Sequence, residues 1–147
     1  MQFKIASLAL LAAFLAPTAL AHPGARTDTV PVTYDNTYDN PRGSLNSVAC
    51  SNGVNGLVTK GYTIFASLPN YPYIGGGFPV PGWNSTECGS CWTIYYEGKN
   101  INVTLVDTAG RGFNIAEKAL NVLTNGRAAQ LGRIDATFAR APAEACA

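Results

Sequence analysis

The sequence predicts a mainly β protein, folded as a closed and mostly antiparallel barrel of five or six short strands with two small helices. Two observations lead to this fold class. Apolar and polar residues alternate in several short segments, as they do in half-buried strands. The chain shows no internal repeat and no alternation of strands with helices, which argues against a parallel α/β architecture. Closure also removes the exposed strand edges through which separate chains can pair.

Turn signals interrupt the first half of the expected barrel. We expect strands at Val30–Tyr34 and Ser47–Cys50 and one short helix at Leu57–Phe65. The stretch CSNGVNGL, which begins at Cys50, contains the Asn and Gly residues of tight turns. Residues Leu68–Thr86 include four prolines and a triple glycine, so we expect no regular element there. The aromatic residues of this segment either serve the function or plug the core.

The pattern is cleaner in the second half. Alternation over residues 91–97 and 101–105, on either side of a turn at Gly98–Asn100, predicts an antiparallel hairpin. Helical spacing of apolar residues predicts a helix over Asn114–Leu123, with Asn125-Gly126 as its stop. A last strand is expected around Ile134–Phe138, before the tail that ends near Cys146.

The N-terminus has the features of a cleavable secretory signal. Lys4 precedes the apolar stretch Ile5–Leu15, and Ala19-Leu20-Ala21 forms a small-residue cleavage site. We therefore expect residues 1–21 to be a signal peptide, residues 22–29 a polar extension or propeptide, and residues 30–147 one domain. No later segment has the roughly 18 apolar residues that a membrane helix needs, so we expect an exported chain without a membrane partner.

Four cysteines, Cys50, Cys88, Cys91 and Cys146, lie in the expected exported part, which indicates two disulfides. Three pairings are possible. A redox or zinc role for Cys88-Gly89-Ser90-Cys91 is disfavoured because there is no second such motif and the only histidine, His22, lies next to the cleavage point. Loop-closure entropy favours a long-range partner for each of Cys88 and Cys91, which leaves two pairings open. We expect no metal and no cofactor.

The charge balance excludes several classes of partner. Without Lys4, nine basic residues balance nine acidic ones, so a nucleic acid or an anionic membrane is not expected. A histidine-based acyl-transfer site is unavailable, and no phosphate-binding loop is present. Only 13% of the residues are charged, while Gly, Asn, Ser and Thr are abundant, which suits a neutral polyhydroxyl ligand or an interface.

Asp107, which ends an apolar run, is the best candidate for chemistry. Glycoside hydrolysis needs two carboxyl groups, and the residue placed to be the partner is Asn114, whose amide cannot transfer a proton. Glu117 and Asp135 are alternative second acids, but each is better explained as a surface charge. We therefore expect a binding surface in which Asp107, Asn114, Asn52 and Asn55 meet hydroxyl and acetamido groups with millimolar to high micromolar affinity, about 4 to 6 kcal/mol.

Two sequons, Asn84-Ser85-Thr86 and Asn102-Val103-Thr104, are candidate N-glycosylation sites. Asn102 falls in the middle of an expected strand, so occupancy is less expected there than at Asn84, and the sequence leaves open whether either sequon is used.

Several blocks of the chain resemble the cerato-platanin family of small secreted fungal proteins. They are VTYDNTYDN, GSLNSVACSNGVNGL, LPNYPYIGGG, GWNSTECGSCW and VDTAGRGFNIA, followed by a final cysteine. The resemblance implies a six-stranded double-psi β-barrel related to expansins, with disulfides Cys50–Cys88 and Cys91–Cys146. It also implies a ligand site at Asp107 and Asn114. To this site we assign Asn52 and Asn55, for their amides, and Gly112.

The resemblance carries expectations about function. Related expansin-like hydrolases have Phe-Asp where this chain has Phe113-Asn114, so it implies binding of chitin or N-acetylglucosamine oligomers without hydrolysis. It further implies secretion to the fungal cell wall, expansin-like wall loosening, elicitation of plant defence through a receptor, and a monomer able to self-assemble at interfaces. A weak glycan hydrolase using Asp107 and a purely surface-active protein are the alternatives.

Overall fold

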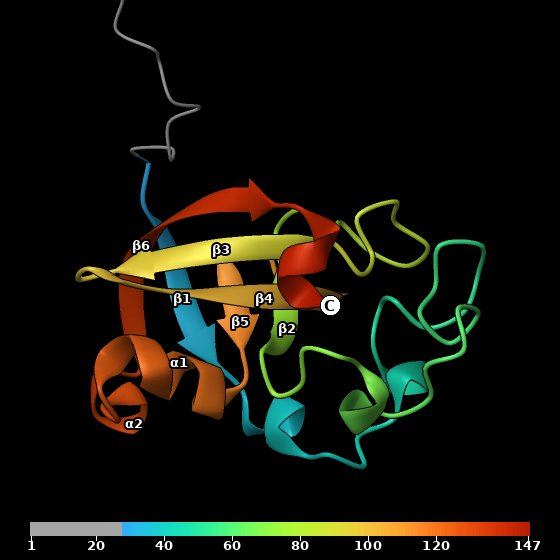
Figure 1. Ribbon diagram of the computed structural model, residues 1–147, viewed down its shortest axis with the longest axis horizontal. Coiled ribbons are helices and arrows are strands. Elements are labelled where there is room, and N and C mark those ends of the chain that lie inside the picture. The colour runs from blue at the N-terminus through green and yellow to red at the C-terminus, as the bar shows by residue number, and fades with distance from the viewer. Residues whose placement is uncertain (1–27) are drawn as a thin grey trace, which may run out of the picture.

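A computed structural model describes residues 28–147, which form a closed six-stranded β-barrel (Figure 1). The order around the barrel is β1-β5-β2-β4-β3-β6. Four of the neighbouring pairs are antiparallel, and β1–β5 and β2–β4 are parallel. The predicted barrel is thus confirmed. The strands are β1 (Val30–Tyr34), β2 (Ile74–Gly77), β3 (Cys91–Tyr96), β4 (Lys99–Thr108), β5 (Phe113–Ile115) and β6 (Arg133–Ala141).

The predicted signal peptide, and all but the last two residues of the predicted extension, lie outside the described residues. No helix within residues 28–147 is long and apolar enough to cross a membrane.

The predicted hairpin has more paired residues than any other pair of neighbouring strands in the barrel. Strands β3 and β4 run antiparallel from Cys91 opposite Thr104 to Tyr96 opposite Lys99. The turn lies at Glu97 and Gly98, both with positive φ, one residue earlier than expected. β4 then continues to Thr108, so that Asp107 lies near the end of the strand away from the hairpin turn.

Two helices, α1 (Glu117–Thr124) and α2 (Ala128–Leu131), cover one end of the barrel (Figure 1). The prediction placed the start of the first helix too early, because residues 113–115 pair with both β1 and β2 as strand β5. The Asp39 carboxylate accepts hydrogen bonds from the first N–H groups of α1, those of Glu117 and Lys118. Asn125 adopts the left-handed conformation after α1, which confirms the predicted stop.

Two other predicted elements are absent from the structure. Ser47–Cys50 is not a strand: a 3-10 turn ends at Ser47, and a single backbone–backbone hydrogen bond, from the Cys50 N–H to Val106 O, joins this stretch to β4. Leu57–Phe65 is not a helix: the Leu57 and Val58 N–H groups bond to Cys50 O and Ser51 O, and at the other end the Phe65 N–H bonds to Gly43 O instead of to the carbonyl four residues back. The chain doubles back on the cysteine segment, and this tertiary pairing overrides local helical propensity.

Strand β2 lies inside the segment predicted to have no regular structure. A Cβ atom on Gly75 would lie 2.4 Å from Asn114 O, and one on Gly76 would lie 2.3 Å from Thr108 O. Glycine is therefore required for β2 to fit between β4 and β5. The prolines that argued against a strand flank β2 rather than interrupt it.

The aromatic residues of this same segment divide between the two predicted roles. Phe78 packs with Trp92, Phe113 and Phe138 at ring distances of 5.3 to 6.2 Å, so it contributes to an aromatic cluster. Trp83, by contrast, is 62% exposed. Ring packing therefore accounts for Phe78, which is 37% exposed, whereas Trp83 is left for another role.

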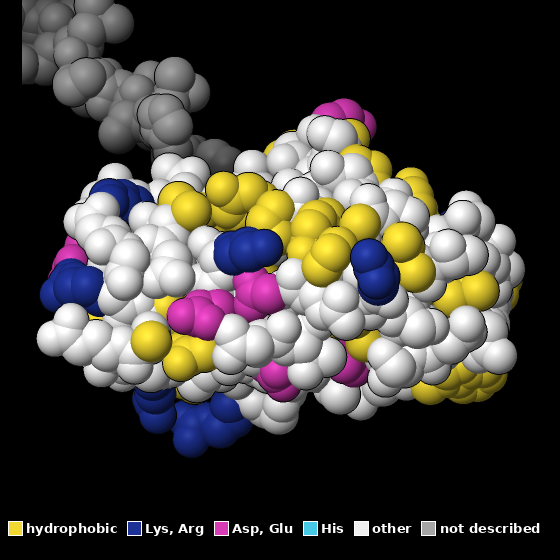
Figure 2. All heavy atoms as spheres, turned by 90° about the horizontal axis from the view of Figure 1, so that it is seen from below, with side chains coloured by type: hydrophobic (Ala, Val, Ile, Leu, Met, Phe, Trp, Pro, Cys, Tyr) yellow, Lys and Arg dark blue, Asp and Glu magenta, His cyan; other side chains and the backbone are white. Residues whose placement is uncertain are grey.

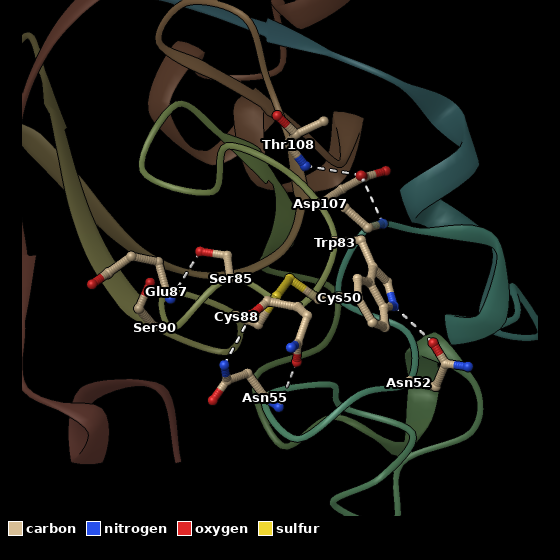
Figure 3. The surroundings of a disulfide bond; sticks show 12 residues. Cys50, Asn52, Asn55, Trp83, Ser85, Glu87, Cys88, Ser90, Asp107 and Thr108 are labelled. Carbon is tan, nitrogen blue, oxygen red and sulfur yellow. Dashed lines mark hydrogen bonds between the residues drawn. A yellow bond between two sulfur atoms is a disulfide. The ribbon is translucent and has the colours of Figure 1, made fainter.

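Two disulfides, Cys50–Cys88 and Cys91–Cys146, confirm the pairing that the family resemblance implied. They span 38 and 55 residues, and in the chain-entropy account each loop of this size stabilises the fold by about 4 kcal/mol. Cys50–Cys88 joins two irregular loops (Figure 3). Cys91–Cys146 fixes the tail to the first residue of β3.

Candidate functional site

Gly76 lies between Asp107 and Asn114 in the sheet. On β2, it pairs with Asp107 of β4 on one side and with Asn114 of β5 on the other. Because paired residues share a face, the two polar side chains belong to one row, with their Cα atoms two strand spacings, or about 10 Å, apart. Both are half-buried. Thr33 of β1 pairs with Asn114 and extends the row to a fourth strand.

The Asp107 carboxylate holds neighbouring parts of the chain. Its Oδ2 accepts a hydrogen bond from the Tyr38 hydroxyl at 3.1 Å, and its Oδ1 accepts from the N–H groups of Ala49 and Thr108 at 3.0 and 2.8 Å. A carboxylate offers about four acceptor positions, so about one remains for a ligand. Asp107 therefore has a structural role as well as a candidate binding role.

The environment of Tyr38, which includes the charge of Asp107, changes the pKa of its hydroxyl. Burial, followed by the negative charge of Asp107 and the hydrogen bond to it, raises the pKa of the Tyr38 hydroxyl well above its ordinary value. The hydroxyl therefore stays protonated and remains a donor to Asp107 at neutral pH.

Asn114 presents a donor. Its Oδ1 accepts a hydrogen bond from Thr33 Oγ1 at 3.0 Å, which fixes the orientation of the amide. Within residues 28–147, its Nδ2 donates no hydrogen bond. The row thus combines an acceptor at Asp107 with a donor at Asn114.

Among residues 28–147, neither alternative acid shares a hydrogen-bond partner with Asp107. Asn36 Nδ2 donates to the Glu117 carboxylate at the start of α1. Asp135 pairs with Arg133 at 2.8 Å on the exposed face of β6. Asp135 also lines a hollow of about 440 Å³ beside the β3–β4 turn, together with Lys99. Asp107 lies eight residues further along β4, which is about 25 Å.

Asn52 and Asn55 bond to the loop that faces them (Figure 3). Trp83 Nε1 donates to Asn52 Oδ1 at 2.7 Å, and Asn55 donates through its N–H to Asn84 Oδ1 at 3.0 Å and through its Nδ2 to Asn84 O at 2.9 Å. These amides therefore join the two loops that Cys50–Cys88 also joins. The structure gives them no bond to a member of the Asp107–Asn114 row.

Gly112 has a backbone role. Its φ is +62°, and a Cβ atom there would lie 1.8 Å from Pro31 O. Its carbonyl accepts a hydrogen bond from the Phe78 N–H at 2.9 Å. It lines a separate hollow of about 320 Å³ that also contains Arg111.

Sequence reasoning missed Tyr38 and Thr33 as members of the site. Thr33 occupies a polar position of an alternating strand, but the sequence contains no signal of its register against Asn114. Tyr38 lies within the block VTYDNTYDN but 69 residues from Asp107, and nothing in that block indicates their contact. Within residues 28–147, no group of three or more Cys, His, Asp or Glu residues is arranged to hold a metal ion.

Comparisons with known proteins agree with this architecture. The chain is 44% identical to the heat-stable 19 kDa antigen of Coccidioides immitis over 146 residues, which cover 99% of this chain and 98% of that protein. It is similar to the crystal structure of cerato-platanin 1 from M. perniciosa, with TM-score 0.78, 39% identity, and coverage of 80% of this chain and 99% of that one.

The solution structure of the fungal elicitor Cerato-Platanin is also similar, with TM-score 0.71, 33% identity, and coverage of 80% of this chain and 96% of that one. The barrel therefore has the double-psi form of these proteins. Because the Cerato-platanin family model matches residues 30–147, the chain belongs to the cerato-platanin family, a disulfide-bonded secreted fungal family.

Proposed function

We propose that this protein is a secreted, non-catalytic binder of chitin or N-acetylglucosamine oligomers. The observation that carries the proposal is the position of Asp107 and Asn114 on either side of Gly76, with no side chain between them. A sugar hydroxyl donates to Asp107, and an acetamido carbonyl accepts from Asn114 Nδ2. The two groups match the polar groups of N-acetylglucosamine.

The proposal of binding without hydrolysis follows from the chemistry of the row. Glycosidases use two carboxyl groups on opposite sides of the scissile bond, at most about 10 Å apart. Asn114 stands where the second would be, and an amide neither donates nor accepts the required proton. A hydrolase would release reducing ends from chitin or β-glucan, and Asp107→Asn would abolish the release. We expect no release from either protein.

The binding test compares two asparagines, one in the proposed site and one outside it. Asn114→Ala removes the free donor of the row, whereas Asn100→Ala removes an exposed amide at the other end of β4. In calorimetric titration with N-acetylglucosamine oligomers, we expect the first variant to lose about five- to tenfold in affinity, as for one hydrogen bond. The second should bind like the natural protein. A larger loss of affinity in Asn100→Ala than in Asn114→Ala would contradict the proposed site. It would place the ligand in the hollow beside the β3–β4 turn, which Asn100 lines.

Elicitation of plant defence and loosening of fungal wall polymer are part of the same proposal. The related solution structure is named a fungal elicitor, which supports the first. If recognition follows oligomer binding, Asn114→Ala should weaken defence responses in leaf infiltration while Asn100→Ala should not.

A surface-active protein is the second candidate. Exposed apolar side chains favour it: Trp83 is 62% and Val54 79% exposed, and Figure 2 shows hydrophobic side chains gathered across the face on the side of α1. Film formation at an air–water interface that survives Asn114→Ala, without measurable oligomer binding by the natural protein, would favour this function.

A further inference from the structure

The two sequons lie in very different environments. Asn84 is in an irregular loop, with a φ of +59°. Its Oδ1 and its backbone carbonyl both accept hydrogen bonds from Asn55, so the oxygen side of the carboxamide is fixed toward the protein. Among residues 28–147, its Nδ2 has no acceptor. Thr86, the hydroxyl residue of this sequon, is exposed.

Both polar atoms of the Asn102 side chain form hydrogen bonds. Its Nδ2 donates to Ala145 O at 3.2 Å, and its Oδ1 accepts from Thr93 Oγ1 at 2.8 Å. The backbone carbonyl accepts from Asn70 Nδ2. Three segments therefore enclose this amide, one of them the tail that Cys91–Cys146 fixes. A sugar on Asn102 would occupy the space into which that tail packs.

An exposed aromatic ring lies beside Asn84. A Cβ atom built on Gly53 would lie 2.6 Å from Asn84 Oδ1 and 3.1 Å from Trp83 Cζ2, so the carboxamide and the indole approach the same point of the opposite loop. The indole is held in place by its bond to Asn52. It is nevertheless 62% exposed, and aromatic faces with one polar edge are well suited to cover an amphipathic partner.

The geometry points to Asn84 as the N-glycosylation site of the folded protein, with the first N-acetylglucosamine lying on the face of Trp83. Transfer comes from a lipid-linked oligosaccharyl diphosphate. The bond from sugar C1 to the diphosphate oxygen breaks, the bond from C1 to Asn84 Nδ2 forms, and the amide loses one proton. Because transfer precedes folding, chains modified at Asn102 fail to dock the tail and are not recovered as folded product.

The full chain secreted from a yeast tests the site. Thr86→Ala removes the first sequon while leaving Asn84 and its bonds in place, and Thr104→Val removes the second. Intact mass and peptide mapping should show one oligosaccharide, on Asn84, in the natural protein and in Thr104→Val, and none in Thr86→Ala. Unmodified natural protein, or folded protein carrying sugar on Asn102, would overturn the site.

A second measurement tests the contact with Trp83. The glycoprotein is trimmed by an endoglycosidase to a single N-acetylglucosamine and compared with Thr86→Ala by acrylamide quenching of tryptophan fluorescence. The trimmed protein should be quenched less. In a Trp83→Phe background, where Trp92 remains, the difference should vanish. Equal quenching of the two proteins, or a difference that persists without Trp83, would overturn the contact.

Discussion

The Tyr38 hydroxyl donates a hydrogen bond to Asp107 Oδ2 at 3.1 Å, which joins the 3-10 turn at Asn36–Asp39 to the end of β4. The other oxygen of the same carboxylate accepts from Ala49, the residue before the Cys50–Cys88 disulfide. Asp107 therefore fastens the long irregular segment after β1 to the barrel beside the candidate binding row.

The Tyr38–Asp107 contact should make stability depend on alkaline pH. The pKa of Tyr38 is raised in the folded protein, first by burial and then by Asp107, whereas the unfolded chain has a tyrosine pKa of about 10. The resulting stabilisation is complete below pH 10 and is lost as the pH rises toward the folded pKa. At pH 11 the loss should be about 1 kcal/mol.

Urea unfolding of the natural protein and of Tyr38→Phe at pH 8 to 11 measures this loss. The variant should be less stable at pH 8 by about 1 kcal/mol, and the gap between the two proteins should narrow above pH 10. A constant gap would show that Tyr38 titrates alike in both states. Comparing the two proteins removes the contribution of the other tyrosines.

Substitutions of Asp107 should lower the free energy of unfolding, and the loss should be larger when more of its acceptor oxygens are removed. Asp107→Ala leaves the donors of Tyr38, Ala49 and Thr108 without their partner, and we expect it to cost about 3 kcal/mol. Asp107→Asn keeps one acceptor oxygen for the two N–H groups and should cost clearly less. Chemical denaturation of both variants checks the order. Equal and small losses in both variants would contradict a structural role for the Asp107 carboxylate.

Gly76→Ala should destabilise the barrel strongly. The new Cβ would lie 2.3 Å from Thr108 O, a backbone atom that cannot move aside without opening β4. We expect a loss of about 3 kcal/mol. Gly110→Ala is the matched control, because a Cβ there has no neighbour within 4 Å, and it should change the unfolding free energy by less than about 0.5 kcal/mol. Similar midpoints for both variants would contradict the close packing of β2.

Thr104→Val should stabilise the unglycosylated protein. Thr104 is buried, and its Oγ1 has no hydrogen-bond partner among the described residues. Replacing the hydroxyl by a methyl group removes an unsatisfied polar atom at nearly constant volume, which should add about 1 kcal/mol. Thr93→Val removes a hydroxyl that does bond, to Asn102, and should destabilise. Thermal unfolding of the two variants should therefore shift in opposite directions.

Local patterns predicted the parts of the fold that local forces determine. The β3–β4 hairpin, the left-handed stop at Asn125 and strand β6 all follow from periodicity and turn chemistry. Strand β2 could not be found in this way, because Gly75 and Gly76 carry no side chain to alternate. They are needed only because the backbones of β4 and β5 approach closely. That requirement exists in the assembled barrel and leaves no periodic signal.

The same distinction between local and long-range information applies to the candidate site. Asp107 and Asn114 could be selected because their residue types and positions carry chemistry. Their relation across Gly76 depends on a parallel and an antiparallel pairing of short strands, which no segment encodes by itself. Asn52 and Asn55 were chosen for residue type alone, and the structure gives them loop contacts instead.

NMR mapping of oligomer binding tests the central claim most directly. With the natural protein and an N-acetylglucosamine oligomer, the account predicts that the largest shifts occur at the side-chain amide of Asn114 and the backbone amides of Gly76 and Thr33. Shifts concentrated instead around Tyr95 and Lys99, which line the hollow beside the β3–β4 turn, would contradict it.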